Sequence, residues 1–403
     1  MYASSAWSPS TTKITIQKQL YTVQRGFALK MCRAYRTVSL NASLALTGLL
    51  PLDIRVREAA SLYKARRGVP RPELGDREME KKLPYTSTPH PAKHMRLEFL
   101  HLTDQQDVVA NVSSAVKIYT DGSKIEGKVG ASLSVWHNET ETKSVKLKLS
   151  PHCTVYQAEL LAICRATRHA LESKHVSYAI ISDSRSALET VANALPLHPL
   201  ATEARTNIAH CKLQGKDVSL FWIKAHAGLE GNERADVLAK EAALRMKTKP
   251  TYDKCPISFV KRQIRKDSLD EWNHKYKTDT TASTTKIFFP DLLEAHNTIR
   301  RIQPTGVLTQ VLTGHGGFSE YLNRFKCKED PSCICEPGVS ESVAHILLSC
   351  PIHALQRLEL EMSLDIQLKL DNLGSLIRDK RTRETFLSYC TKLAAVVINR
   401  NKT

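Results

Sequence analysis

The sequence has no long hydrophobic run, and no stretch approaches the roughly 20 apolar residues that a membrane-spanning helix needs. Residues 1–17 also lack the apolar core of a secretory signal peptide, and no internal repeat is visible along the chain. These absences predict an intracellular protein of the cytoplasm, the nucleus or both, with no membrane partner.

Basic residues clearly outnumber acidic ones. In 403 residues, Lys and Arg total 58 against 41 Asp and Glu, which gives a formal net charge of +17. A positive excess of this size favours polyanionic partners, of which nucleic acid is the first. The length suits two or three domains, each with its own core.

The residue pattern changes several times along the chain. Residues 14–67 carry apolar residues at helical spacing, residues 69–91 are rich in proline and charge, and residues 113–246 alternate between strand and helix patterns. That alternation predicts an α/β fold with a mixed five-stranded sheet flanked by helices. We therefore predict a helical segment at 1–68, a linker at 69–112, the α/β domain at 113–246, a helical connector at 247–326, a cysteine and histidine motif at 327–355 and a helical tail at 356–403.

Four carboxylates of the α/β segment each lie beside an apolar run: Asp121, Glu159, Asp183 and Asp236. An unpaired carboxylate near a core costs several kcal/mol, so a positive partner is expected. Two divalent cations about 3.5 to 4 Å apart could share the four acids and hold the attacking and leaving oxygens of a phosphodiester. Taken singly, each acid is more often a helix cap or half of an ion pair.

Four motifs in order, "IYTDGS", "YQAELLAI", "IISDS" and "WIKAHAGLEGNERADVLAKEA", resemble the type 1 ribonuclease H family. The resemblance implies a ribonuclease H-like fold and two-Mg²⁺ hydrolysis of the RNA strand of an RNA/DNA hybrid. It makes Asp121, Glu159, Asp183 and Asp236 catalytic metal ligands. His226, on a loop with two glycines, would handle a proton or help release product.

Further residues match the family motifs as substrate contacts rather than metal ligands. The segment "CTVYQAEL" lacks the asparagine-rich run with which many relatives read RNA sugar hydroxyls, so Gln157 is expected to take that place. The predicted substrate contacts are Gly122, Ser123, Gln157, Ser184 and Asn232.

The flanks resemble parts of non-LTR retrotransposon proteins of the R1/jockey type. Residues 24–63, "QRGFALKMCRAYRTVSLNASLALTGLLPLDIRVREAASLY", are similar to the thumb-like region that follows the polymerase core of their reverse transcriptases. The Asp-Asp pair of the polymerase occurs nowhere in the chain. The resemblance implies a C-terminal part of such a polyprotein, with the element's reverse transcriptase polypeptide as a partner.

One segment combines cysteines with a histidine. Cys333, Cys335, His345 and Cys350 follow the spacing C-x-C-x9-H-x4-C, which suits one structural zinc ion and resembles the C-terminal motif of the same retrotransposon proteins. Cys327 could replace Cys333 as a ligand, although the close pair at 333 and 335 favours Cys333.

Two alternatives to the hydrolase remain open. Exonucleases and integrases also place acids on such a sheet, but the exonucleases usually carry a second acid where this chain has Ser123, and integrases lack the closing motif with His226 and Asp236. A catalytically silent nucleic-acid-binding relic of a retrotransposon would need only the positive charge.

Overall fold

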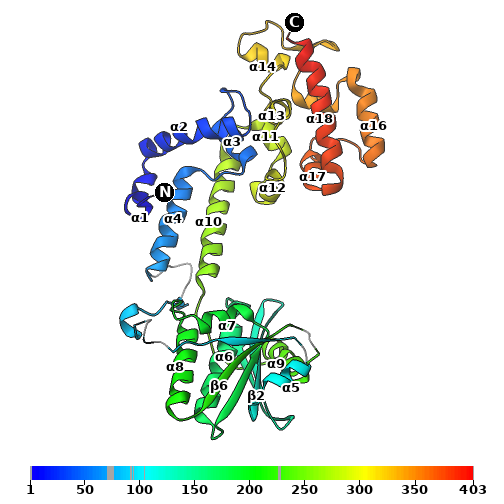
Figure 1. The fold of residues 1–403 in the computed structure, drawn as a ribbon. Coiled ribbons are helices and arrows are strands. Elements are labelled where there is room, and N and C mark those ends of the chain that lie inside the picture. Colours follow the sequence, from blue (N-terminus) through cyan, green and yellow to red (C-terminus); the bar gives the residue numbers. More distant parts are fainter. Residues whose placement is uncertain are drawn as a thin grey trace. The chain divides into compact units, whose positions relative to one another are not determined.

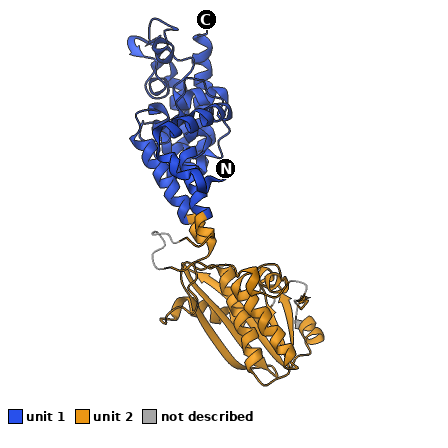
Figure 2. Ribbon diagram, turned by 90° about the vertical axis from the view of Figure 1, so that its left-hand side faces the viewer, with its two compact units in different colours: residues 1–63, 263–403 blue, residues 64–262 orange. Residues whose placement is uncertain are grey.

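The structure of the protein is a computed structural model that describes residues 2–69, 77–90, 93, 95–103, 105–225 and 228–402. The chain divides into two compact units (Figure 2). Residues 1–63 and 263–403 form the first, called the helical unit here, and residues 64–262 form the second, called the sheet unit. The chain passes from one unit to the other within two helices, α4 (Leu52–Arg66) and α10 (Ile257–Thr278).

The sheet unit contains a mixed sheet with the strand order β1-β6-β5-β2-β3-β4. Strands β1, β6, β5 and β2 run parallel to one another, and β3 and β4 continue the sheet antiparallel. The bounds are β1 Phe99–Leu102, α5 Gln105–Asn111, β2 Val116–Ile125, β3 Lys128–His137, β4 Thr140–Leu149, α6 Val155–Glu172, β5 Ser177–Ser182, α7 Arg185–Ala192, α8 Pro199–Leu213, β6 Asp217–Ile223 and α9 Glu230–Arg245.

Alternate residues of the central strand β2 serve two cores, because successive side chains of a strand point to opposite faces. Ile118 packs with residues of α6, α7 and α8, whereas Tyr119 packs with residues of α5 and α9. The helices accordingly cover both faces of the sheet (Figure 1). Gly130 allows the α9 side to close, since a Cβ at this position would lie 2.3 Å from the backbone oxygen of Ala239.

The α/β fold with a mixed sheet and flanking helices is confirmed, with one strand more than predicted. Among the described residues the sheet has six strands, and the additional one, β1, lies within the predicted linker of residues 69–112. It pairs with β6 from Phe99↔Leu220 to Leu102↔Ile223. Four residues with mixed polarity give too short a pattern for a strand to be recognised from sequence.

More of the linker packs on the sheet unit. Met79 forms a β-bridge with Cys255, and the backbone N–H of Leu83 donates to the oxygen of Leu197 at 2.9 Å. The two units therefore divide the chain differently from the predicted segments. Residues 1–63 lie in one unit with residues 263–403, which include most of the predicted connector, the cysteine and histidine motif and the helical tail.

The helical unit is built almost entirely of helices, with one small hairpin. Besides α4 and α10 its bounds are α1 Ser4–Trp7, α2 Ile14–Met31, α3 Leu40–Thr47, α11 Ser283–Phe288, α12 Leu292–Ile299, α13 Gly306–Thr313, α14 Ser319–Arg324, β7 Ser332–Cys333, β8 Glu336–Ser340, α15 Val343–Leu348, α16 Ala354–Leu364, α17 Leu373–Arg378 and α18 Lys380–Arg400. Short 3-10 turns occur at Ser8–Thr12, Tyr85–Ser87 and Pro351–His353, the second of these in the sheet unit.

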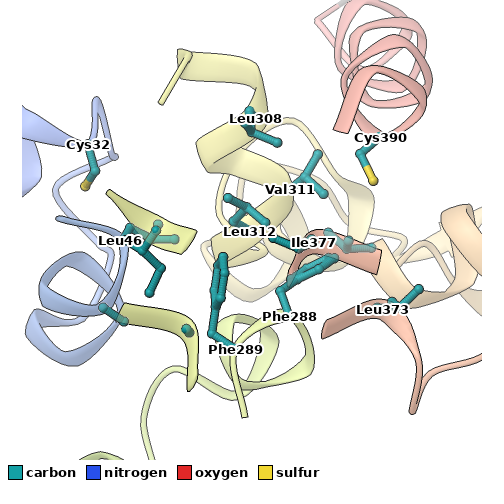
Figure 3. Close-up of a cluster of buried hydrophobic side chains, with 14 of the residues drawn as sticks. Cys32, Leu46, Phe288, Phe289, Leu308, Val311, Leu312, Leu373, Ile377 and Cys390 are labelled. Atoms are coloured by element: carbon teal, nitrogen blue, oxygen red, sulfur yellow. The ribbon is translucent and has the colours of Figure 1, made fainter. Parts of the chain in front are cut away.

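One hydrophobic core joins the two ends of the chain within the helical unit. Leu46 from the N-terminal part contributes to the same buried cluster as Phe288, Val311 and Cys390 from the C-terminal part (Figure 3). Burial of apolar surface contributes about 25 cal/mol per Å², so this shared core stabilises the association of both ends. No helix among the described residues is both long and apolar enough to cross a membrane.

Candidate functional site: an acid cluster and a Cys/His cluster

Three of the predicted acids meet beside the central strands β5 and β2 of the sheet, where β5 ends. One carboxylate oxygen from each of Asp121, Glu159 and Asp183 lies within 4.8 Å of the others. These three residues, called the acid cluster here, come from strand β2, helix α6 and the turn after strand β5. A group of converging carboxylates is the ligand set that Mg²⁺ and Ca²⁺ prefer.

The register of the sheet explains why Asp121 and Asp183 are neighbours. Thr120 of β2 pairs with Ser182, the last residue of β5, so each aspartate directly follows a paired residue on adjacent parallel strands. Glu159 approaches because the next residue on β2 is Gly122. A Cβ at Gly122 would lie 2.6 Å from the backbone nitrogen of Glu159, so any larger residue would push α6 away.

Burial and mutual repulsion make the acid cluster electrostatically unfavourable by itself. Asp121 is 7% exposed and Glu159 is 6% exposed. Burial, followed by the charges of Asp183 and Asp236, raises the pKa of Asp121 to about 7. Burial, followed by the charges of Asp121 and Asp183, raises the pKa of Glu159 well above its ordinary value.

Two oxygens of the acid cluster have no hydrogen-bond partner among the residues that the structure describes. They are Asp121 Oδ2 and Glu159 Oε2, and both are buried. Buried polar atoms are usually satisfied, and an unsatisfied one calls for an explanation such as an ion. The residues present therefore fit a divalent cation, which would supply the missing contacts and offset the repulsion.

Asp236 lies near the acid cluster without joining it. It is on α9 and forms an ion pair with Lys240 at 2.6 Å, one turn later on the same helix. Its charge nevertheless contributes to the raised pKa of Asp121. The structure thus brings three of the four predicted metal ligands within ligand distance of one another and places the fourth beside a lysine.

The other predicted site residues differ in burial and in hydrogen bonding. His226 lies outside the described residues. Asn232 on α9 is 4% exposed, and its Oδ1 has no hydrogen-bond partner in the described part of the chain. Ser123 is buried on β2, and Ser184 is half-buried at the start of α7.

Gln157 has a structural role that conflicts with the predicted substrate contact. It is 1% exposed, and its Oε1 accepts from the backbone N–H of Thr154 in a capping box at the start of α6. Its Nε2 donates to Glu80 at 2.8 Å and to the backbone oxygen of Lys254 at 3.2 Å. Both ends of the Gln157 side chain are therefore occupied by hydrogen bonds within the chain.

Glu80, which was not among the predicted site residues, supports the start of α6. Its carboxylate accepts from Gln157 and from the hydroxyl of Tyr252, and it lies 3.1 Å from His198 Nε2. Burial opposes the charge of Glu80, but these hydrogen bonds and His198 outweigh it and lower the pKa of Glu80. A single Glu in a segment rich in charge carries no signal that could have identified it.

The second site is the Cys/His cluster of Cys333, Cys335, His345 and Cys350 in the helical unit. Its four ligand atoms all lie within 4.8 Å of one another. The sulfurs of Cys333 and Cys350 are 3.8 Å apart, and Cys335 Sγ lies 3.3 Å from His345 Nε2. The hairpin β7–β8 and helix α15 position these residues.

These distances suit a tetrahedral metal site. Two thiolates bound to zinc at about 2.3 Å each lie about 3.8 Å apart, which is the separation seen here. His345 Nδ1 lies 3.1 Å from the Ser349 hydroxyl, which orients the ring as an outer partner of a metal-bound histidine does. Cys327 is exposed and its thiol donates to the backbone oxygen of Phe325, so it is outside the cluster. The Cys/His cluster could bind zinc.

Comparison with known proteins finds a family match within the sheet unit. Residues 113–244 match the model of the RNase H family. A Retrovirus-related Pol polyprotein from type-1 retrotransposable element R1 of Popillia japonica is 24% identical over 246 residues, which are 60% of this chain and 94% of that protein. Ribonuclease H1 of Rattus norvegicus is 25% identical over 190 residues, which cover 43% of this chain and 64% of that protein.

A second R1-type relative matches a shorter stretch of the chain. The Retrovirus-related Pol polyprotein from type-1 retrotransposable element R1 4 of Nasonia vitripennis is 34% identical over 90 residues. That match covers 22% of this chain and 22% of the polyprotein. The chain therefore has homology to R1 retrotransposon polyproteins and spans about a fifth of this one.

Proposed function

We propose that the protein hydrolyses the RNA strand of RNA/DNA hybrids as a metal-dependent endonuclease. The observation that carries this proposal is the acid cluster, in which three carboxylates converge and two buried oxygens lack a partner in the described residues. The match of residues 113–244 to the RNase H family supports the same activity.

Asp121, Glu159, Asp183 and Asp236 would hold two Mg²⁺ ions. When bound, such ions polarise the phosphate and activate water for attack. The chain's own contribution is the geometry. The sheet register fixes Asp121 beside Asp183, and the close contact at Gly122 fixes Glu159. Asp236 would exchange its ion pair with Lys240 for a metal ion, and we assign proton handling or product release to His226.

Four polar positions near these acids are proposed to contact the substrate: Gly122, Ser123, Ser184 and Asn232. The partnerless Oδ1 of Asn232 makes it the strongest of the four, because a sugar hydroxyl could donate to this oxygen. Gln157 is left out because its capping and Glu80 contacts occupy both ends of its side chain.

We further propose that the chain acts as part of a retrotransposon polyprotein, with the element's reverse transcriptase polypeptide as partner, in the cytoplasm or nucleus. The homology to R1 polyproteins supports this setting. The helical N-terminal residues would be the thumb-like part. One structural zinc ion would be held by Cys333, Cys335, His345 and Cys350, whose sulfur and nitrogen atoms fit a tetrahedral site.

The test is a cleavage assay on a labelled RNA strand. The full chain is incubated with an RNA/DNA hybrid, with single-stranded RNA and with duplex DNA, each with and without Mg²⁺. An Asp183→Asn variant is the matched comparison, because it keeps the side-chain shape and removes the charge. We expect cleavage only of the hybrid, only with Mg²⁺ and only by the unaltered chain.

Two results would contradict the proposal. Equal cleavage by Asp183→Asn would exclude the acid cluster as the site of the reaction. An intact hybrid that still binds the protein would favour the catalytically silent nucleic-acid-binding relic, for which the net charge of +17 suffices.

A further inference from the structure

The helical unit contains a polar cavity of about 300 Å³ whose lining residues belong to neither site described above. Its walls come from four places in that unit: the start of α3, the turn between α10 and α11, the end of α13, and α14. Helices α3, α11 and α13 lie side by side in Figure 1. Cavities that bind small ligands begin at about this size, which suits a group no larger than one nucleotide.

Hydroxyl groups dominate the wall of the cavity. The turn between α10 and α11 and the first residues of α11 supply Thr280, Thr281, Ser283 and Thr284, and Thr37, Ser39 and Thr313 also line the cavity. Hydroxyls both donate and accept, so they can bond the edge of a nucleobase or a phosphate oxygen. One carboxylate, that of Glu320, and one guanidinium, that of Arg324, are among the lining groups.

Aromatic rings gather at this cavity. Tyr321 lies 4.7 Å from Phe325, 5.0 Å from His315 and 6.4 Å from Tyr35 between ring centres. These four residues are called the ring cluster here. Tyr35 is 49% exposed and Phe325 is 43% exposed, although large aromatic side chains are usually covered. Exposed rings beside a polar cavity are surfaces on which bases stack.

The ring cluster is held in place by hydrogen bonds and carries a positive charge. The hydroxyls of Thr37 and Tyr321 are 2.7 Å apart, and His315 Nδ1 lies 3.1 Å from the Thr37 hydroxyl. The guanidinium of Arg324 lies 5.6 Å from the centre of the Tyr321 ring and 5.5 Å from that of Phe325. Arg324 makes no ion pair within the described ranges, so its charge is available for a phosphate.

We propose that this cavity and its ring cluster bind one unpaired nucleotide of a single-stranded nucleic acid. The base stacks on the exposed rings and meets the hydroxyls of the cavity wall, and Arg324 contacts the adjacent phosphate. A duplex keeps its bases stacked inside, so it could engage only the charge. This site is in the helical unit and does not depend on the hydrolase activity proposed for the sheet unit.

The experiment measures binding of a dye-labelled single-stranded DNA of about 12 nucleotides, a length within the range of known single-strand sites. The full chain is used in buffer without Mg²⁺, and fluorescence anisotropy gives the Kd. Phe325→Ala should weaken binding about tenfold, the loss expected for one stacked base. The matched control is Phe27→Ala, since Phe27 on α2 is 67% exposed and lies outside the cavity wall.

Arg324→Gln provides a second readout that a folding defect would not produce. Each phosphate contact to a single strand contributes about 0.7 to the slope of log Kd against log salt, so the slope should fall by about that amount. Arg381→Gln, at an 89% exposed position on α18, should leave the slope unchanged. Thermal unfolding of each variant checks that the helical unit is intact.

Three outcomes would overturn the proposal. In the first, Phe325→Ala binds as tightly as Phe27→Ala. In the second, Arg324→Gln leaves the salt slope at the value of Arg381→Gln. In the third, Phe325→Ala weakens the binding of duplex DNA of equal length as much as that of the single strand. The site would then not distinguish an unpaired base from a paired one. A failed hybrid-cleavage assay would leave all three measurements interpretable.

Discussion

The acid cluster and the Cys/His cluster each hold their ligand atoms within 4.8 Å of one another, yet they are assembled in different ways. The acids at residues 121, 159 and 183 come from a strand, a helix and the turn after a second strand, and the sheet register brings Asp121 beside Asp183. The ligands at residues 333 to 350 come from one hairpin and the helix after it. The first cluster depends on a whole domain, whereas the second is nearly local.

The two clusters also differ in what they contribute without a cation. Burial, and after it the repulsion between like charges, raises the pKa of Asp121 and of Glu159, so the domain folds in spite of the acid cluster. The Cys/His cluster links a two-stranded hairpin to the short helix α15 that follows it. Removal of a charge from the acid cluster should therefore stabilise the protein. Removal of a ligand from the Cys/His cluster should destabilise it.

The strongest test removes the Cys/His cluster. Cys350→Ser with His345→Ala should abolish zinc, counted at one ion per chain by elemental analysis. It should also lower the free energy of unfolding by an amount on the order of 5 kcal/mol, since zinc binding contributes directly to folding. Cys327→Ser is the control, because this exposed thiol lies outside the cluster. Zinc retained by the double variant would remove the assignment.

Neutralising one member of the acid cluster should separate activity from stability. Glu159→Gln should lower hybrid cleavage about a thousandfold, near 4 kcal/mol of activation free energy, through loss of a metal ligand. Without Mg²⁺ the same variant should have a free energy of unfolding that is higher by about 1 kcal/mol or more, because a buried charge that is repelled by its neighbours is gone. Denaturant unfolding measures this difference.

The control for this comparison is Glu172→Gln, at an exposed position at the other end of α6. It should change neither activity nor stability. A lower stability of Glu159→Gln would show that Glu159 is stabilised by partners rather than repelled, and the contrast between the two clusters would fail.

The pH dependence of stability offers a third test. The ordinary pKa of Asp is about 4, whereas that of Asp121 is raised to about 7, so the folded state binds this proton more tightly than the unfolded state. The stabilisation is therefore complete at low pH and is lost as the pH rises from about 4 to about 7. At about 1.4 kcal/mol per pKa unit, a loss of a few kcal/mol is expected in Mg²⁺-free urea unfolding.

Asp121→Asn should flatten this part of the pH profile, and added Mg²⁺ should do the same in the unaltered chain. A loss of stability over the same window that is equally large in Asp121→Asn would mean that Asp121 is not the group responsible.

The smallest expected effect concerns the support of the acid cluster from outside the predicted domain. Glu80→Gln should lower the stability of the sheet unit by about 1 to 3 kcal/mol, since a buried charged hydrogen-bond network is weakened. Glu78→Gln is the neighbouring control, because Glu78 forms only an exposed ion pair with Lys254 and should change stability by less than about 0.5 kcal/mol. Denaturant unfolding of the two variants gives the comparison.

Much of the site could be predicted from sequence because its residues interrupt strong periodic patterns. Asp121, Glu159 and Asp183 each stand at the edge of an apolar strand or on an amphipathic helix, and such patterns fix the elements. The Cys/His spacing was similarly informative, because its ligands are close in sequence. The choice of Cys333 over Cys327 agrees with the cluster in the structure.

The contacts that sequence reasoning missed join residues far apart in the chain. Glu80 reaches Gln157 and Tyr252, and strand β1 adds to the sheet beside β6. Gln157 was predicted to face the substrate because its position matched a family motif. In the structure its side chain instead forms hydrogen bonds with Thr154, Glu80 and Lys254. Glu80 lies 77 residues before Gln157 in the sequence, and Lys254 lies 97 residues after it.

The sequence by itself determined five strands of the sheet, the acids beside them and the zinc-type spacing, because each depends on local periodicity and residue type. Only the tertiary structure decided that residues 1–63 share a core with residues 263–403, that Asp236 pairs with Lys240, and that a hydroxyl-lined cavity lies beside the ring cluster. The physical reason is that these features depend on packing between distant segments, and no local pattern of residues encodes which distant surfaces will meet.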